Sequence, residues 1–222
     1  MQTCQKSKGS ITAFIEPFIL YWVLFLPSWG FPVPEAFSFS INRELGRIFS
    51  YNIPSLALIW YLFLRLESPT LSSAGLRPGR RDLLTVLFTL PGLIALGVLV
   101  SLIGSFFPSP ISAPAVEAPR GLAAVSVMIL SCLSTGYLEE SYFRLYLFTR
   151  FRESGVSPVK GMVVSSLLFA LCHVYEGPLG ALNAFLAGLL LFFIFTHRQT
   201  IHGLAWAHGG YNIFVYVMAG GG

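Results

Sequence analysis

The stretch at residues 138–144, Leu-Glu-Glu-Ser-Tyr-Phe-Arg, decides how this chain is interpreted. It lies inside a long apolar run, from Gly121 to Phe148, which has the length and composition of a membrane-spanning helix. Each charged group at the centre of such a helix costs about 2.5–3.5 kcal/mol on insertion scales. Because that cost is high, we expect the two carboxylates and the guanidinium to serve a function.

The spacing of these charged groups predicts how they pair. On a helix Glu140 and Arg144 lie one turn apart, so they can form an ion pair. Glu139 points about 100° away from Glu140 and has no partner on its own helix. We therefore interpret Arg144 as the structural partner of Glu140, and Glu139 as the carboxylate that is free for chemistry.

The composition is that of a polytopic membrane protein. Of the 222 residues, 55% are hydrophobic and only 11% are charged, whereas a soluble domain usually has about 25% charged residues. The net charge of +4 is small and the basic residues lie between apolar runs, so we expect no nucleic-acid partner. The three cysteines are far apart and form neither a disulfide framework nor a CxxC zinc motif.

Seven apolar runs are long enough, or nearly long enough, to cross a membrane. They cover residues 12–31, 49–65, 83–107, 121–149, 160–176, 178–197 and 200–219. We therefore predict an all-α, polytopic transmembrane helical bundle of about seven membrane helices, with eight as the alternative count. Residues 1–222 are expected to form a single integral membrane domain, with its active site in the C-terminal half.

The lysines and arginines predict the orientation of this bundle. If the seven runs alternate in direction, ten basic residues fall on the side of the N-terminus and three on the other side, with Arg144 left inside a run. Because cytoplasmic loops are enriched in lysine and arginine, this bias predicts a cytoplasmic N-terminus. We expect a multi-pass protein of a bacterial inner or cell membrane.

Two further polar motifs lie in the C-terminal half of the chain. One runs from Phe169 to His173 in the fifth apolar run, and the other from His208 to Asn212 in the seventh. At about 1.5 Å per residue, Glu139, His173 and His208 all lie roughly 15–20 Å from the basic residues on the cytoplasmic side. Asn212 follows His208 by about one turn on the same face. We therefore expect these groups to share one buried cavity that contains water.

These residue types suit the hydrolysis of a peptide bond by activated water. A carboxylate in a partly dry cavity can take a proton from water, and a neighbouring histidine can orient that water. A second histidine and an amide can donate hydrogen bonds to the developing oxyanion. We interpret Cys172, beside His173, as a packing residue. Glu16 and Glu176, which lie near the ends of apolar runs, are expected to be solvated.

The ordered motifs Glu-Glu-x-x-x-Arg, Phe-x-x-x-His and His-x-x-x-Asn resemble those of the CAAX protease and bacteriocin-processing (CPBP/ABI) family of glutamate-type intramembrane proteases. The resemblance covers about residues 121–215, which would form the catalytic core. It implies an all-helical endopeptidase that cleaves membrane-associated or lipid-modified substrates, such as CAAX-type proteins, bacteriocin leaders or C-terminal sorting tags. It also implies that Glu139 is the catalytic base, that His173 orients the water, and that His208 and Asn212 form the oxyanion site.

Three alternatives stay open on the sequence alone. Glu139, His173 and His208 are also plausible zinc ligands, although the chain lacks H-E-x-x-H and we favour the metal-free enzyme. Carboxylates and histidines in a membrane also form proton relays, as in a proton-coupled transporter, but we find polar groups only in the second half of the chain. A non-catalytic immunity or scaffold protein is the third alternative. Membrane lipid and a membrane-bound peptide or protein are the expected partners.

Overall fold

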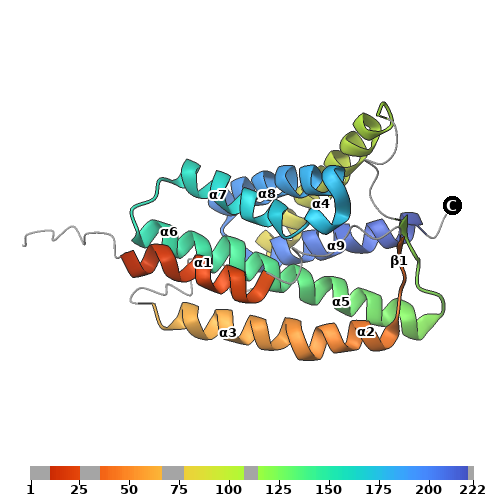
Figure 1. Ribbon diagram of the computed structural model, residues 1–222, viewed down its shortest axis with the longest axis horizontal. Helices are drawn as coiled ribbons and strands as arrows, with labels where there is room; N and C mark the ends of the chain where they lie inside the picture. The colour runs from red at the N-terminus through yellow and green to blue at the C-terminus, as the bar shows by residue number, and fades with distance from the viewer. Residues whose placement is uncertain (1–10, 26–35, 67–77, 108–114, 220–222) are drawn as a thin grey trace, which may run out of the picture.

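The computed structural model describes residues 11–25, 36–66, 78–107 and 115–219. In this part the chain is mostly helical, and its helices run side by side along the long axis of the molecule (Figure 1). The predicted all-α bundle is therefore confirmed for the described residues. Part of the first predicted span, residues 26–31, and three of the basic residues used to predict the orientation (Lys6, Lys8 and Arg77) lie outside them.

Seven continuous helical segments follow one another in the described part, and each corresponds to one predicted apolar run. They are α1 (Ile11–Phe25); α2 (Ile41–Gly46) continued by the π-helix η2 (Arg47–Asn52) and α3 (Ile53–Leu64); α4 (Arg80–Gly104); α5 (Leu122–Glu140) continued by the π-helix η3 (Ser141–Tyr146) and α6 (Leu147–Glu153); α7 (Pro158–Leu171); the 3₁₀-helix η4 (Val174–Glu176) with α8 (Gly177–Arg198); and α9 (Ile201–Ala219).

Three of these segments are long and apolar enough to cross a membrane. They are α4, the continuous α5–η3–α6 helix, and η4 with α8, whereas α1 and α7 are shorter apolar helices. The two-residue strands β1 (Ala36–Phe37) and β2 (Ala115–Val116) pair in parallel and join the chain before α2 to the chain before α5. The described part therefore has the helices of an integral membrane protein and only this small sheet.

Contacts between α5 and its neighbours give the relative directions of four segments. Successive residues of α2–η2–α3 contact successive residues of α5–η3, from the Arg47–Ser131 pair to the Trp60–Ser141 pair, so these two segments run parallel. Helix α9 is antiparallel to α5, because Tyr137 contacts His202 near the start of α9, whereas Gly209 approaches the earlier part of α5. Helix α1 also runs against α5–η3–α6.

The remaining segments alternate in the same way. Helix α4 runs parallel to α9, and α8 runs antiparallel to α4, with Leu190 near Gly92 and Leu179 near Gly104. Helix α7 is antiparallel to α8, where Gly188 packs on Ser166. All seven segments thus alternate in direction along the chain, which is the arrangement that seven consecutive membrane crossings require.

The alternating directions separate the basic residues into two groups. One end of the bundle, which we call the basic end, carries most of the described ones: Arg65, Arg80, Arg81, Arg150, Arg152, Lys160 and Arg198. The opposite end carries Arg43, Arg47 and Arg120. In Figure 1 the basic end lies at the left, and the C-terminus marks the opposite end. The asymmetry that the sequence predicted is therefore present across the long axis of the bundle.

Two glycines bring α5 and α9 into close contact. A Cβ atom added at Gly136 would lie 2.7 Å from the carbonyl oxygen of Ala205, and one added at Gly209 would lie 3.0 Å from the Cα of Leu133. Because real side chains do not fit at such distances, only glycine allows this approach. The close packing brings the Glu pair at the end of α5 next to His208 on α9.

Helix α7 is too short to cross a membrane by itself. Its 14 residues span about 21 Å at 1.5 Å per residue, compared with a hydrocarbon thickness of about 30 Å. The helix ends at Leu171, and Gly177, with φ of +82°, begins α8 after the short η4 turn. His173 therefore lies in this turn and not inside a span, which corrects the sequence interpretation.

Candidate active site

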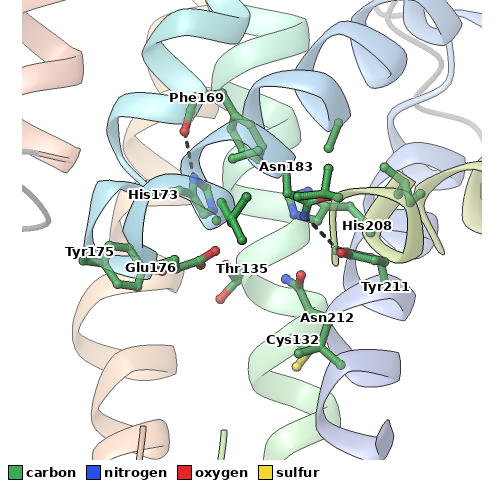
Figure 2. A pocket seen from close by; sticks show the side chains of 18 of the residues that line it. Cys132, Thr135, Phe169, His173, Tyr175, Glu176, Asn183, His208, Tyr211 and Asn212 are labelled. Atoms are coloured by element: carbon green, nitrogen blue, oxygen red, sulfur yellow. Dashed lines mark hydrogen bonds between the residues drawn. The ribbon is translucent and has the colours of Figure 1, made fainter. Parts of the chain in front are cut away.

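A cavity of about 1000 Å³ lies between α2, α4, α5, α8 and α9, next to the turn that follows α7. The four residues predicted to carry the chemistry all line it: Glu139, His173, His208 and Asn212. Figure 2 shows His173 and Glu176 on one side of this cavity, with His208, Tyr211 and Asn212 on the other. Polar groups from three separate helical segments therefore meet around one space.

The cavity is open at one end and closed at the other. Its lining includes exposed residues at the end opposite the basic end, among them Phe107, which is 54% exposed. Deeper in the bundle its lining is buried, as Leu191 and Phe169 show with 0% and 2% exposure. Glu139 and His208 belong to this buried part, with 9% and 5% exposure. The carboxylate of Glu139 and the imidazole of His208 therefore lie in the buried part of the cavity.

His208 connects the two carboxylates of the Glu pair. Its Nδ1 lies 2.9 Å from Oε1 of Glu140, and its Nε2 lies 3.5 Å from Oε2 of Glu139. An ionised carboxylate only accepts hydrogen bonds, so Nδ1–H is the donor to Glu140. Oε2 of Glu139 is buried and has no hydrogen-bond partner among the described residues. A proton on either Nε2 or this Oε2 would turn their contact into a hydrogen bond.

The predicted ion pair between Glu140 and Arg144 is present and fully buried. Nε of Arg144 lies 3.2 Å from Oε2 of Glu140, and both side chains have 0% exposure. The guanidinium carbon also lies 5.1 Å from the ring centre of Phe169 and 5.7 Å from that of Phe143. A carboxylate and two aromatic faces thus surround the buried cation, which is favourable for a desolvated guanidinium.

Phe169 links all three sequence motifs. Its ring lies 4.6 Å from the ring of His173 and 5.7 Å from that of His208, and it also covers Arg144. Its carbonyl oxygen lies 2.7 Å from Nδ1 of His173 (Figure 2). Because a carbonyl only accepts, Nδ1–H of His173 donates this bond, so in the neutral form of the ring the lone pair is on Nε2. The sequence named Phe169 as part of a motif but assigned it no contact.

Two asparagines line the cavity from different helices. Asn212 lies one turn beyond His208 on α9. Asn183 on α8 donates from Nδ2 to the hydroxyl of Tyr211 at 3.0 Å, and its buried Oδ1 has no hydrogen-bond partner among the described residues. The contact of Asn183 with Tyr211 was not expected from the sequence, because a single asparagine in an apolar run gives no indication of its partner.

Two glutamates that were expected to be solvated also have neighbours within the protein. Glu176 lines the cavity from the η4 turn, beside His173. Glu16 on α1 accepts a hydrogen bond from the Tyr146 hydroxyl at 2.6 Å and pairs with Arg150. Both side chains stay partly exposed, with 34% exposure for Glu16, so these protein contacts come in addition to the expected solvation.

The sulfur of Cys172 also belongs to the turn. It lies 3.1 Å from the carbonyl oxygen of Phe169 and 3.4 Å from Nδ1 of His173. Adjacent residues do not face each other inside a helix, but here the helix has ended and the two side chains meet. The thiol is buried and contacts the same carbonyl as the histidine, so it supports the turn.

The residues around the cavity do not form a metal-binding group of the expected kind. Among the residues that the structure describes, no three His, Cys, Asp or Glu side chains are arranged to hold a metal ion. Both ring nitrogens of His208 face carboxylates, and Nδ1 of His173 is used by a backbone carbonyl.

Comparison with known protein families identifies the same part of the chain. A family model matches residues 121–214; the family is described as type II CAAX prenyl endopeptidase Rce1-like. Neither the curated proteins nor the solved structures contain a match. The matched segment begins just before α5, ends within α9 and contains all three motifs. The resemblance inferred from those motifs is thereby confirmed, because residues 121–214 of this chain match the Rce1-like family model.

Proposed function

We propose that this protein is an intramembrane endopeptidase that hydrolyses a peptide bond with water activated by Glu139. One observation carries the proposal: Glu139, His173, His208 and Asn212 line a single cavity, inside the segment that matches a protease family. The cavity is open at one end and buried at the other, so water and a peptide can reach the carboxylate. Residues 121–215 hold this catalytic core.

Glu139 is the proposed base, and His173 is its partner. The free, buried Oε2 of Glu139 takes a proton from water as the water oxygen attacks the carbonyl carbon. Nδ1–H of His173 is held by the carbonyl of Phe169, so Nε2 can accept a hydrogen bond from the same water and orient it. The proton on Glu139 then passes to the leaving amine, and the carboxylate is regenerated.

His208 and Asn212 are the proposed oxyanion donors. The hydrogen bond from Nδ1 to Glu140 fixes the ring of His208 and leaves its Nε2 facing Glu139. Nε2–H can then donate to the oxyanion as it forms, and the amide of Asn212 supplies a second donor. Glu140 and Arg144 act in this scheme by positioning His208 and not by contacting substrate.

The cavity geometry also bears on the side from which substrate enters. Its open end lies opposite the basic end of the bundle. With the basic end in the cytoplasm, as the charge bias favours, substrate enters from the other side of the membrane. Among the candidate substrates, this favours the membrane-bound tag or leader of an exported protein over a cytoplasmic CAAX protein.

The decisive experiment compares wild type with Glu139→Gln. Termini of membrane peptides are identified by proteomics in cells that express one or the other protein, and substrates found in this way are then incubated with purified enzyme. Wild type should produce new termini that are absent with Glu139→Gln, while both proteins show the same thermal unfolding in detergent. Full cleavage by Glu139→Gln would exclude the mechanism. Proton flux into liposomes without peptidase activity would support the transporter alternative instead.

The orientation has its own test in intact cells. Arg120 and Lys160 are exposed and lie at opposite ends of the bundle. Arg120→Cys should react with a membrane-impermeant maleimide in intact cells, and Lys160→Cys only after lysis. The reverse pattern would place the open end of the cavity in the cytoplasm.

A further inference from the structure

A second charged cluster lines the open part of the same cavity. It consists of Arg43, Glu44 and Arg47, with Ser131 from α5. Glu44 is buried, and its Oε2 accepts a hydrogen bond from Ser131 Oγ at 2.7 Å and lies 2.6 Å from Nη2 of Arg47. Its Oε1 lies 3.6 Å from Nε of Arg43. One buried carboxylate thus holds two guanidinium groups, and the cluster keeps a net charge of +1.

The two guanidinium groups are held in place but not covered. Nε and Nη2 of Arg47 contact Ser131 Oγ at 3.2 and 2.6 Å. The side chains of Arg43 and Arg47 are nevertheless 54% and 40% exposed, and both line the cavity. Since a guanidinium has five N–H donors, Arg47 keeps donors that Glu44 and Ser131 do not use. A fixed cation with spare donors suits the binding of a carboxylate.

The charge at this end of the cavity is opposite to the charge at its buried end. Two carboxylates, Glu139 and Glu140, lie at the buried end, where Arg144 is the one arginine or lysine among the described residues. An anionic group on a bound peptide is therefore repelled from the catalytic end and attracted to Arg43 and Arg47. This polarity gives the bound peptide a preferred direction.

The distance between the two ends follows from α5. Arg47 contacts Ser131, and Glu139 follows Ser131 on the same helix by eight residues, or about 12 Å. An extended peptide covers about 3.3 Å per residue. An anionic group held by Arg47 would thus lie about three to four residues from the bond next to Glu139.

We propose that Arg43 and Arg47 form an anion subsite for a carboxylate of the substrate, about three to four residues from the scissile bond. The proposal rests on the proposed peptidase function and specifies its substrate. The carboxylate belongs either to the C-terminus of the peptide or to an acidic side chain at the same distance. The chemistry is the same in both cases, and suitable probes separate the two.

The test measures peptide binding to Glu139→Gln protein in detergent, so that no probe is cleaved. The first probe is a farnesylated Cys-Val-Ile-Ala peptide with a free C-terminal carboxylate, and the second is its C-terminal amide. The third is the amide with glutamate in place of the last residue. At least one of the two carboxylate probes should bind about 3- to 10-fold more tightly than the amide, as for a charged hydrogen bond that stays partly solvated. Added salt should reduce the difference.

The variants assign that preference to the cluster. Arg43→Gln, added to Glu139→Gln, should remove most of the difference between carboxylate and amide, whereas Arg47→Lys keeps a positive charge and should retain part of it. Arg120→Gln is the matched control, because Arg120 is exposed at the same end but does not line the cavity. It should leave the preference unchanged.

The outcomes separate this inference from the peptidase function. Equal binding of the three probes, or a preference that Arg43→Gln leaves intact, would overturn the anion subsite even if wild type cleaves peptides. A preference that depends on Arg43, found in a protein that cleaves no peptide, would support the subsite and contradict the peptidase. Tighter binding of the first probe than of the third shows that the subsite binds a C-terminal carboxylate. Tighter binding of the third probe shows that it binds an acidic side chain.

Discussion

Nδ1 of His208 lies 2.9 Å from Oε1 of Glu140, although 68 positions separate the two residues in the sequence. The other oxygen of Glu140 faces Nε of Arg144 at 3.2 Å. One carboxylate therefore balances a buried cation and orients an imidazole whose Nε2 faces Glu139. Glu140 is thus a positioning residue. Its loss should affect stability through Arg144 and catalysis through His208.

The first prediction concerns Glu140→Gln. The substitution leaves Arg144 buried without its counter-charge, which typically costs about 3–5 kcal/mol of stability. It also removes the carboxylate that orients His208, so kcat should fall strongly while the substrate still binds. Thermal unfolding in detergent and steady-state cleavage measure the two effects on the same preparation.

A double variant separates these effects. Glu140→Gln with Arg144→Met removes the uncompensated cation and should recover much of the lost stability. Its kcat should stay low, because His208 still lacks its partner. Wild-type kcat in the double variant would contradict the positioning role of Glu140.

The second prediction concerns Asn212, the proposed amide donor to the oxyanion. Removal of one such donor typically lowers kcat by about 10²–10³, so Asn212→Ala should retain weak activity with little change in KM. Asn183→Ala is the matched control. It removes another amide from the same cavity, but the amide of Asn183 already donates a hydrogen bond to Tyr211. A larger loss of kcat in Asn183→Ala than in Asn212→Ala would contradict this role of Asn212 and assign the oxyanion contact to α8 instead of α9.

Much of the fold could be predicted from the sequence, because a membrane helix needs about 20 apolar residues and charged loops interrupt such runs. The seven predicted runs correspond to the seven helical segments of the described part. The end of α7 at Leu171 could not be predicted in this way. An apolar run continues through the turn up to Gly177, and hydropathy alone does not distinguish a helix from an apolar turn that lines a cavity.

The site was predictable where the partners lie on one helix. The pairing of Glu140 with Arg144 follows from their spacing of four residues. Contacts between helices were not predictable, because spacing says nothing about which faces meet. The bond from His208 to Glu140, the position of Glu176 in the cavity and the Arg47–Ser131 contact all belong to this second kind.

The third prediction tests the close contact of α5 and α9. A methyl group at residue 209 would meet backbone atoms of Leu133 and Cys132 at 3.0–3.1 Å, so Gly209→Ala must push the helices apart. Such overpacking costs about 1–3 kcal/mol, and the shift should also lower activity because it moves His208 from the Glu pair. Gly210→Ala is the matched control, since its methyl group would meet only the Leu90 side chain at 3.4 Å. Equal stability of the two variants would show that α5 and α9 are not so close.

The fourth prediction concerns metal ions. Nδ1 of His173 and Nδ1 of His208 both donate hydrogen bonds, and Nε2 of His208 faces the carboxylate of Glu139. A zinc site needs three protein ligands around one point, and among the described residues no three His, Cys, Asp or Glu side chains are placed in this way. Purified protein should therefore cleave its substrate at an unchanged rate after prolonged treatment with a chelator and removal of the chelated metal. Loss of cleavage that added zinc restores would contradict the metal-free mechanism.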